Sequence, residues 1–196
     1  MNIFISGFND IVPLYCIVVN TTSKSNNWSK ELSPFFLGPV QLHNKDDWAK
    51  NVENAWQFSK VYPEHDLDTM PFYHYYNWAT DGWNDTWAHR YPMGKGKTPL
   101  YSLWGDERLS YIEARKKIYI PLYCKAAIKT KAFVKLKEIL LGEKDLYLID
   151  YDGYNHKKLG MSYLDVVNCE TKKMGHAFVL GMMLEKVVDE KGNLIF

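Results

Sequence analysis

The sequence predicts an α+β domain, mainly helical, with a small β-sheet. Short runs rich in β-branched or aromatic residues, at 2–6 and 14–19, predict strands, whereas residues 106–141 and 176–188 have the length and apolar spacing of helices. The chain has 196 residues, of which 46% are hydrophobic and 24% charged, so a disordered or collagen-like chain is excluded. We therefore expect one domain over residues 1–196.

The first third of the chain predicts two strands, a loop and a helix. The two strand runs are separated by turn-forming residues between Gly7 and Asp10. Residues 20–34 are polar and rich in Asn and Ser, which predicts a surface loop. Apolar side chains then recur at helical spacing over residues 46–62, so we expect a helix there, capped by Asp46 or the aspartate after it.

Residues 63–105 show no clear period and contain several Pro and Gly residues. A loop of this length inside a compact domain is usually functional, so we interpret the segment as a Trp-rich insertion at about 63–105 with short helical turns. Asp106 is expected to cap the helix that follows, and Pro121 to interrupt it.

The last third predicts a helix that Gly142 ends, a strand and a buried helix. The strand is DLYLID at 145–150. The segment 176–188 is apolar on nearly every face at its start, which indicates a helix inside the protein.

Cysteines and hydropathy restrict the class of protein. The three cysteines are scattered and form no CxxC pair, which is typical of reduced thiols in a cytoplasmic protein and argues against a structural zinc site. No apolar run reaches the ~18–20 residues that a membrane span needs, and the first ten residues lack the pattern of a signal peptide. We expect no membrane association, no metal and no cofactor, and the sequence indicates no oligomeric state.

Basic and aromatic residues are distributed unevenly. Eight basic residues and no acidic one lie between Arg115 and Lys137, which favours either a basic face for phosphates or a solvated helical surface. Six of the seven tryptophans fall between residues 48 and 104. Such crowding is typical of a pocket for a planar ligand, although it also fits a Trp-rich core.

A first candidate group lies on one stripe of the helix expected at 46–62. Glu53, Trp56, Gln57 and Lys60 follow one another at i, i+3, i+4 and i+7. In a site, Trp56 would stack on a ring, Gln57 would supply directional hydrogen bonds, and a partly desolvated Glu53 would have a raised proton affinity. Without a site, Glu53 and Lys60 would be exposed and only Trp56 would pack.

Two further groups could carry chemistry. Glycines alternate with lysines after Arg90, at Lys95 and Lys97, so this turn could hold a phosphate or be a plain solvated turn. Asp150 and Asp152 directly follow an expected strand, a place where active-site rims and ordinary turns both occur.

The order of these segments resembles the NADAR (YbiA-like) superfamily of N-glycosidases. That family has an SNF-like segment, a helix with the pattern Glu-His-Tyr-Phe-Gln-Ala-x-Lys, a Gly-Arg turn before a Trp, a helix pair, an acidic strand end and a glycine-containing apolar helix. The matching segments here are Ser33-Pro34-Phe35-Phe36, Glu53-Asn54-Ala55-Trp56-Gln57-Phe58-Ser59-Lys60, Gly94-Lys95, Trp104, residues 111–141, Leu146–Asp152 and Gly175–Leu184.

The resemblance implies hydrolysis of an N-glycosidic bond between a base and a ribose or deoxyribose. Such a bond breaks through an oxocarbenium-like transition state, which a carboxylate near the anomeric carbon stabilises, or for which it activates water. Glu53 is the candidate for that role, and Asp150 or Asp152 for a second carboxylate. The candidates for base stacking and phosphate contact are Trp56, Trp83, Trp87, Trp104, Arg90, Lys95 and Lys97.

The substrate is expected to be either a nucleotide or ADP-ribosyl group, or a normal or modified base within DNA or RNA. The basic stretch and the aromatic excess favour nucleic acid, because base-excising enzymes need backbone neutralisation and a stacking pocket. A DNA glycosylase acting on a modified base would fit a role in defence against phage. The alternatives are a non-catalytic nucleotide or nucleic-acid binding module and a structural protein with a Trp-rich core.

Overall fold

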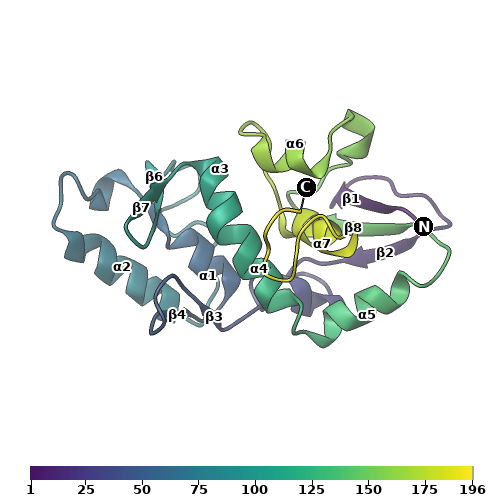
Figure 1. Cartoon of the computed structure of the whole chain (residues 1–196), viewed down its shortest axis with the longest axis horizontal. Helices are drawn as coiled ribbons and strands as arrows, with labels where there is room; N and C mark the ends of the chain where they lie inside the picture. Colours follow the sequence, from purple (N-terminus) through teal and green to yellow (C-terminus); the bar gives the residue numbers. More distant parts are fainter. Residues whose placement is uncertain (196) are drawn as a thin grey trace.

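The computed structural model describes residues 1–195 and has an α+β fold built around small sheets. Figure 1 shows a sheet of β1, β8 and β2 on the right, the helix α2 with strands β6 and β7 on the left, and a long helical segment through α3 and α4 that runs between them. Within residues 1–195, no helix combines the length and the apolar character that crossing a membrane requires.

The sheet on the right is parallel, and its middle strand comes last in the sequence. Strands β1 (Ile3–Gly7) and β2 (Ile17–Asn20) both pair with β8 (Leu146–Asp150), in the order β1-β8-β2. All five residues of β8 are buried, as a central strand requires. The carboxyl ends of the strands therefore meet at one edge, the edge where open α/β sheets bind ligands.

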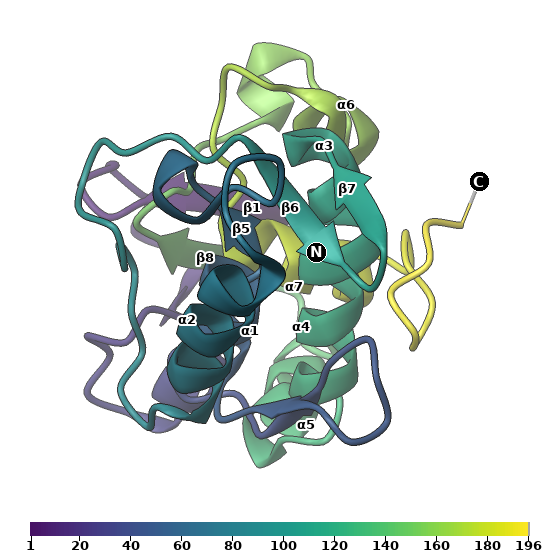
Figure 2. The ribbon, with the colours of Figure 1, turned by 90° about the vertical axis from the view of Figure 1, so that its left-hand side faces the viewer.

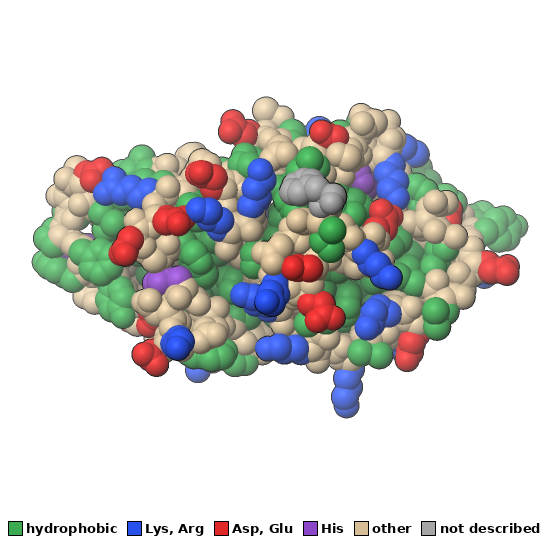
Figure 3. All heavy atoms as spheres, viewed as in Figure 1, with side chains coloured by type: hydrophobic (Ala, Val, Ile, Leu, Met, Phe, Trp, Pro, Cys, Tyr) green, Lys and Arg blue, Asp and Glu red, His purple; other side chains and the backbone are tan. Residues whose placement is uncertain are grey.

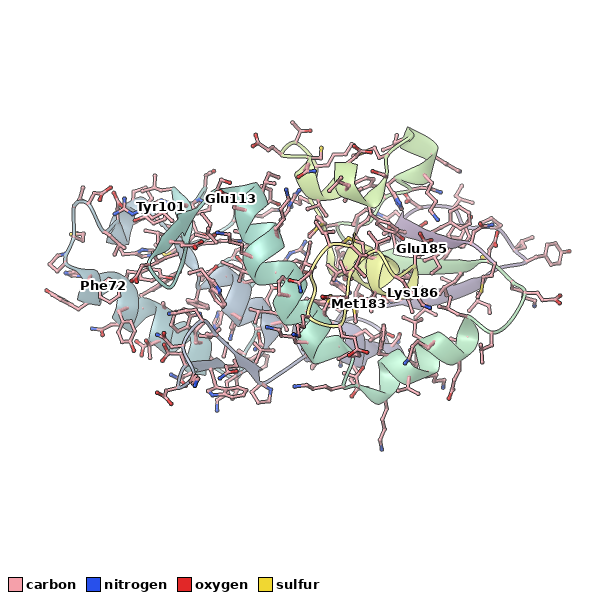
Figure 4. All side chains as sticks on the ribbon, in the orientation of Figure 1. Phe72, Tyr101, Glu113, Met183, Glu185 and Lys186 are labelled. Carbon is pink, nitrogen blue, oxygen red and sulfur yellow. The ribbon has the colours of Figure 1, made fainter. Side chains whose placement is uncertain are left out.

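The buried helix expected near the end of the chain is α7 (His176–Leu184), which packs against β1 and β8. It ends where Lys186 takes the left-handed conformation with φ 57°. Figure 4 places Met183, Glu185 and Lys186 at this end of α7, on the same side of the molecule as the parallel sheet, and Phe72 at the opposite end of the long axis.

The helix expected over 46–62 is shorter than the sequence indicated. Residues Trp48–Ala49 form strand β4, which pairs antiparallel with β3 (Val40–Gln41), and α1 covers only Val52–Gln57. Asn51 begins the helix because its side chain accepts a hydrogen bond from the backbone N–H of Asn54 at 2.8 Å. The expectation of an aspartate cap was therefore wrong.

The segment expected as a long irregular excursion contains regular structure. A 3-10 turn (Pro63–His65) leads to the 13-residue helix α2 (Phe72–Asn84). Strand β6 (Tyr101–Trp104) then joins β5 (Lys60–Val61) in an antiparallel sheet. Figure 2 shows α2 beside α1, and Gly82 permits this contact because a Cβ at that position would lie 2.1 Å from the ring of Phe58.

The helical segment after residue 105 begins later than expected and continues through its proline. Glu107–Leu109 is strand β7, and Ser110 caps α3 (Tyr111–Ala114) in a reciprocal capping box with Glu113. A π-helical turn (Arg115–Tyr119) follows and leads into α4 (Ile120–Ala127). Pro121 does not end the helical segment: it follows the π-helical turn, and α4 continues to Ala127.

The helix that Gly142 was expected to end is present, whereas α6 and the turn before it were not predicted from the sequence. Thr130 caps α5 (Lys131–Ile139), which ends before Gly142, and α6 spans Tyr163–Asn168. A short 3-10 turn, Lys157–Leu159, precedes α6.

The polar segment 20–34 is not the surface loop that its composition indicated. It contains a 3-10 turn, Trp28–Leu32, and several of its polar side chains are buried. They are satisfied internally: the Thr21 hydroxyl donates to the Ile149 carbonyl at 2.9 Å, and the Ser25 and Ser29 hydroxyls lie 2.9 Å apart. The segment therefore packs against the end of β8 instead of extending into solvent.

Candidate active site

A cavity of about 390 Å³ lies at the carboxyl end of the parallel sheet, between that edge, α1, the π-helical turn and the start of α7. It is lined by Ser23, Lys24, Ser33, Pro34, Phe35, Glu53, Trp56, Gln57, Lys60, Arg90, Tyr91, Tyr111, Arg115, Tyr119, Asp150, Tyr151, Asp152, Lys173, Met174, Gly175 and His176. The structure thus brings together all the predicted carboxylates and four of the predicted binding residues, from segments far apart in the sequence.

The α1 wall of the cavity contains the four side chains predicted on one helical stripe, although Lys60 lies in β5, beyond the end of α1. The Gln57 amide donates to a carboxyl oxygen of Glu53 at 2.9 Å, and the Lys60 ammonium donates to the Gln57 carbonyl oxygen at 2.7 Å. The same ammonium lies 4.7 Å from the centre of the Trp56 ring. Glu53 and Lys60 are therefore linked through Gln57 and form no direct ion pair.

Burial dominates the protonation of this wall. It raises the pKa of Glu53, and the hydrogen bond from Gln57 and the charges of Lys60 and Arg90 offset only part of the effect. Burial also lowers the pKa of Lys60 to about 8, against the opposing influence of the Glu53 carboxylate. The wall therefore holds a carboxyl group that keeps its proton more readily than an exposed glutamate does.

The β8–α7 wall also buries a carboxyl group, that of Asp150, but its side-chain partner is a histidine instead of an amide. Asp150 ends the central strand, and its Oδ2 lies 3.1 Å from His176 Nδ1 and accepts a 3.1 Å hydrogen bond from the Ala177 N–H at the start of α7. His176 Nε2 lies 2.8 Å from the carbonyl oxygen of Thr21, which can only accept, so Nε2 carries a proton. Both side chains are buried.

Each partner of this pair favours the charged form of the other. Burial by itself would raise the pKa of Asp150, but the charge of His176 and the hydrogen bonds to the carboxylate lower it below its ordinary value. Burial would likewise lower the pKa of His176, but the Asp150 charge and hydrogen bond raise it. The pKa of Asp150 is thus shifted in the opposite direction from that of Glu53.

Gly175 allows the pair to form. A Cβ at this position would lie 2.1 Å from Asp150 Oδ2 and 2.7 Å from its Cγ. Any larger residue would displace the carboxylate from the imidazole and from the start of α7.

An ion pair lies at the mouth of the cavity. Arg90 Nη2 donates to Asp152 Oδ2 at 3.0 Å, and the Lys173 ammonium lies 3.7 Å from Asp152 Oδ1. Both partners of the Arg90–Asp152 pair are about one third exposed. Asp152 is therefore occupied by cations, which leaves Asp150 and Glu53 as the two deeply buried carboxyl groups of the site.

The π-helical turn contributes two lining residues that the sequence did not indicate as site residues. Tyr119 is buried between Trp56 and the core, and burial and the charge of Glu53 raise its pKa well above the ordinary value, so its hydroxyl remains a donor. Arg115 is fully buried and donates to backbone carbonyls of Val166, Val167, Cys169 and Lys172. It thereby fixes the segment that leads to Lys173.

His176 begins the buried helix expected at 176–188 and is not among the predicted site residues. The structure shows that it is satisfied and that it also lines the cavity beside Asp150. The sequence signal that could have indicated His176 as a site residue is its position at the start of a buried helix. Neither Tyr119 nor Lys173 has this signal.

Five predicted binding residues lie away from the cavity. Trp83 is buried in the core, Trp104 packs edge-on against His43 with ring centres 5.2 Å apart, and Trp87 is 79% exposed. Lys97 instead pairs with Glu64 at 3.0 Å. Lys95 is exposed on a turn whose two glycines, at positions 94 and 96, have φ of 99° and 91°.

The basic stretch is not one surface. Arg115, its first member, is buried, whereas most of the lysines that follow are exposed on α4 and α5, and no residue from 116 to 137 except Tyr119 lines the cavity. Figure 3 shows basic and acidic side chains interspersed on the face that it views. Among residues 1–195, no group of three or more His, Cys, Asp or Glu side chains is arranged to hold a metal ion.

Comparison with known proteins shows one family. Residues 8–158 match a family described as a family of unknown function, DUF6939, and this match covers more than half of the chain. The chain belongs to the DUF6939 family. No curated protein and no solved structure matches it significantly. The matched region includes Glu53, Asp150 and Asp152 but ends before Lys173 and His176.

Proposed function

We propose that this protein is an N-glycosidase that hydrolyses the bond between a base and the anomeric carbon of a ribose or deoxyribose. The observation that carries the proposal is the pair of buried carboxyl groups in one cavity, Glu53 with a raised pKa and Asp150 with a lowered one. Two carboxyl groups whose environments separate their pKa values are the usual arrangement for acid and base roles in glycoside hydrolysis. The resemblance to the NADAR superfamily supports the same reaction.

In the proposed reaction the C1′–N bond breaks and its electron pair goes to the base nitrogen. Protonated Glu53 donates a proton to the departing base, and ionised Asp150 stabilises the positive charge that develops on the sugar. Water then forms a bond to C1′ and gives up one proton to the Glu53 carboxylate, which restores the starting state. Trp56, whose ring is partly buried in the same cavity, provides a face for a planar base.

The charges of the cavity favour an anionic substrate. Five lysine and arginine side chains, together with His176, line it, against the three carboxyl groups, of which Glu53 tends to keep its proton. These basic residues are Lys24, Lys60, Arg90, Arg115 and Lys173. The excess supports a substrate that carries phosphate, either a nucleotide or ADP-ribosyl group or a nucleotide unit of DNA or RNA.

The test is incubation of the protein with normal and modified DNA, RNA, nucleotides and ADP-ribosylated compounds, with mass spectrometry for released bases. Glu53→Gln should lower the rate of base release by about 10²–10⁴-fold, because glutamine cannot donate the proton. It should leave ligand affinity nearly unchanged, since the hydrogen bond from Gln57 can still be accepted.

The matched control is Glu138→Gln, which makes the same change at an exposed position on α5 and should leave base release unchanged. If none of these substrates loses its base while nucleotides still bind, the protein is a binding module and the N-glycosidase proposal is wrong. If Glu53→Gln releases base as fast as the unchanged protein, the assignment of Glu53 as the proton donor fails.

A further inference from the structure

Two aromatic side chains, those of Phe8 and Tyr151, form a stack at the mouth of the cavity. Phe8 directly follows β1 and Tyr151 directly follows β8, so both extend from the carboxyl edge of the parallel sheet. Their rings stack with centres 5.1 Å apart and planes 9° from parallel. They are 47% and 44% exposed, so the stack is open to solvent. We call this pair the Phe8–Tyr151 platform.

A fixed cation accompanies the platform. The Arg90 guanidinium lies 5.6 Å from the centre of the Tyr151 ring and 5.4 Å from that of Tyr91, which is also 44% exposed. The ion pair with Asp152 holds this guanidinium in place. Exposed rings combined with a positioned cation are what proteins use to bind unpaired nucleic-acid strands, because every base has a face that stacks and every linkage carries a negative charge.

The platform extends the cavity outward. Tyr151 and Arg90 line the cavity, whereas Phe8 lies beyond its lining. A ligand that fills the cavity could therefore stack one more planar group on the exposed ring of Phe8, next to Tyr151. A free mononucleotide has no group to place there.

We propose that the substrate is a nucleotide unit within an unpaired strand, and that the neighbouring base of that strand stacks on the Phe8–Tyr151 platform. This inference rests on the proposed N-glycosidase function. It assigns a specificity role to Phe8, which lies before the first segment that resembles the NADAR superfamily. DNA and RNA share the chemistry that the platform recognises, so the experiment includes both.

The loop between β1 and β2 carries other exposed apolar side chains, at Ile11, Leu14 and Tyr15, which are 99%, 94% and 88% exposed. Within the described residues, no arginine or lysine lies over the Tyr15 ring, whereas Arg90 lies over the Tyr151 ring. Tyr15 is therefore a control for a merely exposed aromatic ring.

The experiment measures binding by calorimetry to the full chain carrying Glu53→Gln, so that turnover is slow during the measurement. The probes are phosphorylated dinucleotides, made with deoxyribose and with ribose. They are compared in pairs in which the second position carries either adenine or no base. The second position is placed on the 5′ side in one set and on the 3′ side in the other. The second adenine should raise affinity by about 10-fold, the size of one base–aromatic stack. Phe8→Ala should remove this gain, and Phe8→Trp and Tyr15→Ala should keep it.

Different failures have different meanings. If the dinucleotides bind but the second base adds no affinity, or if Tyr15→Ala removes the gain as Phe8→Ala does, the platform proposal is wrong and the N-glycosidase proposal stands. If neither mononucleotides nor dinucleotides bind, both proposals fail. A gain with deoxyribose alone or ribose alone identifies the kind of strand and supports the platform.

Discussion

Each of the two walls of the cavity buries a carboxyl group, and the two environments shift its pKa in opposite directions. On the α1 wall, Glu53 has a neutral amide as its direct partner, and burial raises its pKa. On the β8–α7 wall, Asp150 has the His176 imidazole and a backbone N–H, and its pKa is lowered. The comparison shows that the charge of the nearest partner, more than depth of burial, decides which carboxyl group keeps its proton.

The walls also differ in how they are built. The α1 wall lies within eight consecutive residues: helical spacing brings Glu53, Trp56 and Gln57 together, and Lys60 follows at the start of β5. The β8–α7 wall requires a strand end, a helix start and the carbonyl of Thr21, which is 155 positions away from His176. Substitutions on the second wall should therefore affect stability far more than those on the first.

The largest effect on stability is expected for Asp150→Asn. This change removes the charge that accompanies buried His176, and breaking a buried ion pair in this way costs about 3–5 kcal/mol. The loss should be largest near pH 5. Asp150 contributes above its ordinary pKa of 3.8 until acid protonates it, and His176 contributes below its ordinary pKa of 6.5 and loses its contribution as pH rises through the raised value.

Denaturant unfolding of Asp150→Asn from pH 4 to pH 9 checks this prediction. Asp152→Asn is the matched control, since its ion pair with Arg90 is about one third exposed and should contribute at most about 1 kcal/mol. Equal losses for the two variants, or a loss for Asp150→Asn that does not vary with pH, would contradict the ionised pair.

An intermediate effect is expected for Gly175→Ala. The added methyl group would lie 2.1 Å from Asp150 Oδ2, and that oxygen is held by His176 and the start of α7. Such overpacking costs about 1–3 kcal/mol, measured as the free energy of unfolding. Gly142→Ala is the control, because its Cβ would meet its nearest atom at 3.4 Å, an ordinary contact. A similar result for both glycines would show that the pair has space to move.

The smallest effect should have the opposite sign. Because Glu53 has a raised pKa in the folded protein, the advantage of holding its proton is present below the ordinary value of 4.5 and is lost as pH rises through the folded value. Glu53→Gln cannot ionise, so it should be more stable than the unchanged protein by about 0.5–2 kcal/mol at pH 8, and the difference should shrink towards pH 5. Thermal unfolding at the two pH values measures it, and destabilisation at pH 8 would contradict the prediction.

The sequence predicted the parts of the site that local geometry controls. Helical spacing placed Glu53, Trp56 and Gln57 on one stripe, and a strand ending in acids placed Asp150 at an edge of the sheet. It did not predict the partner of Asp150, because tertiary packing alone brings His176 to it. The π-helical turn that positions Tyr119 also has no local signature, since its residues are ordinary helix formers followed by a proline.

The largest difference concerns the tryptophans. Their crowding was interpreted as a pocket for a planar ligand, but only Trp56 lines the cavity, and Trp83 lies in the core formed around α1 and α2. Composition gives the number of indole rings but not the direction in which each side chain points. On α2, that direction depends on which face of the helix packs against Phe58. The alternative interpretation, a Trp-rich core, fits Trp83.

The late position of β8 has a consequence for biosynthesis. A ribosome releases β1 and β2 long before Leu146–Asp150 exists, and neither early strand has its pairing partner until then. The nascent chain must therefore carry two unpaired strand segments through most of its translation, a state that favours association with chaperones or with other chains. Synthesis of this one strand then completes the sheet and adds Asp150, whereas the cavity at its edge is complete only after residues 173–176 have been made.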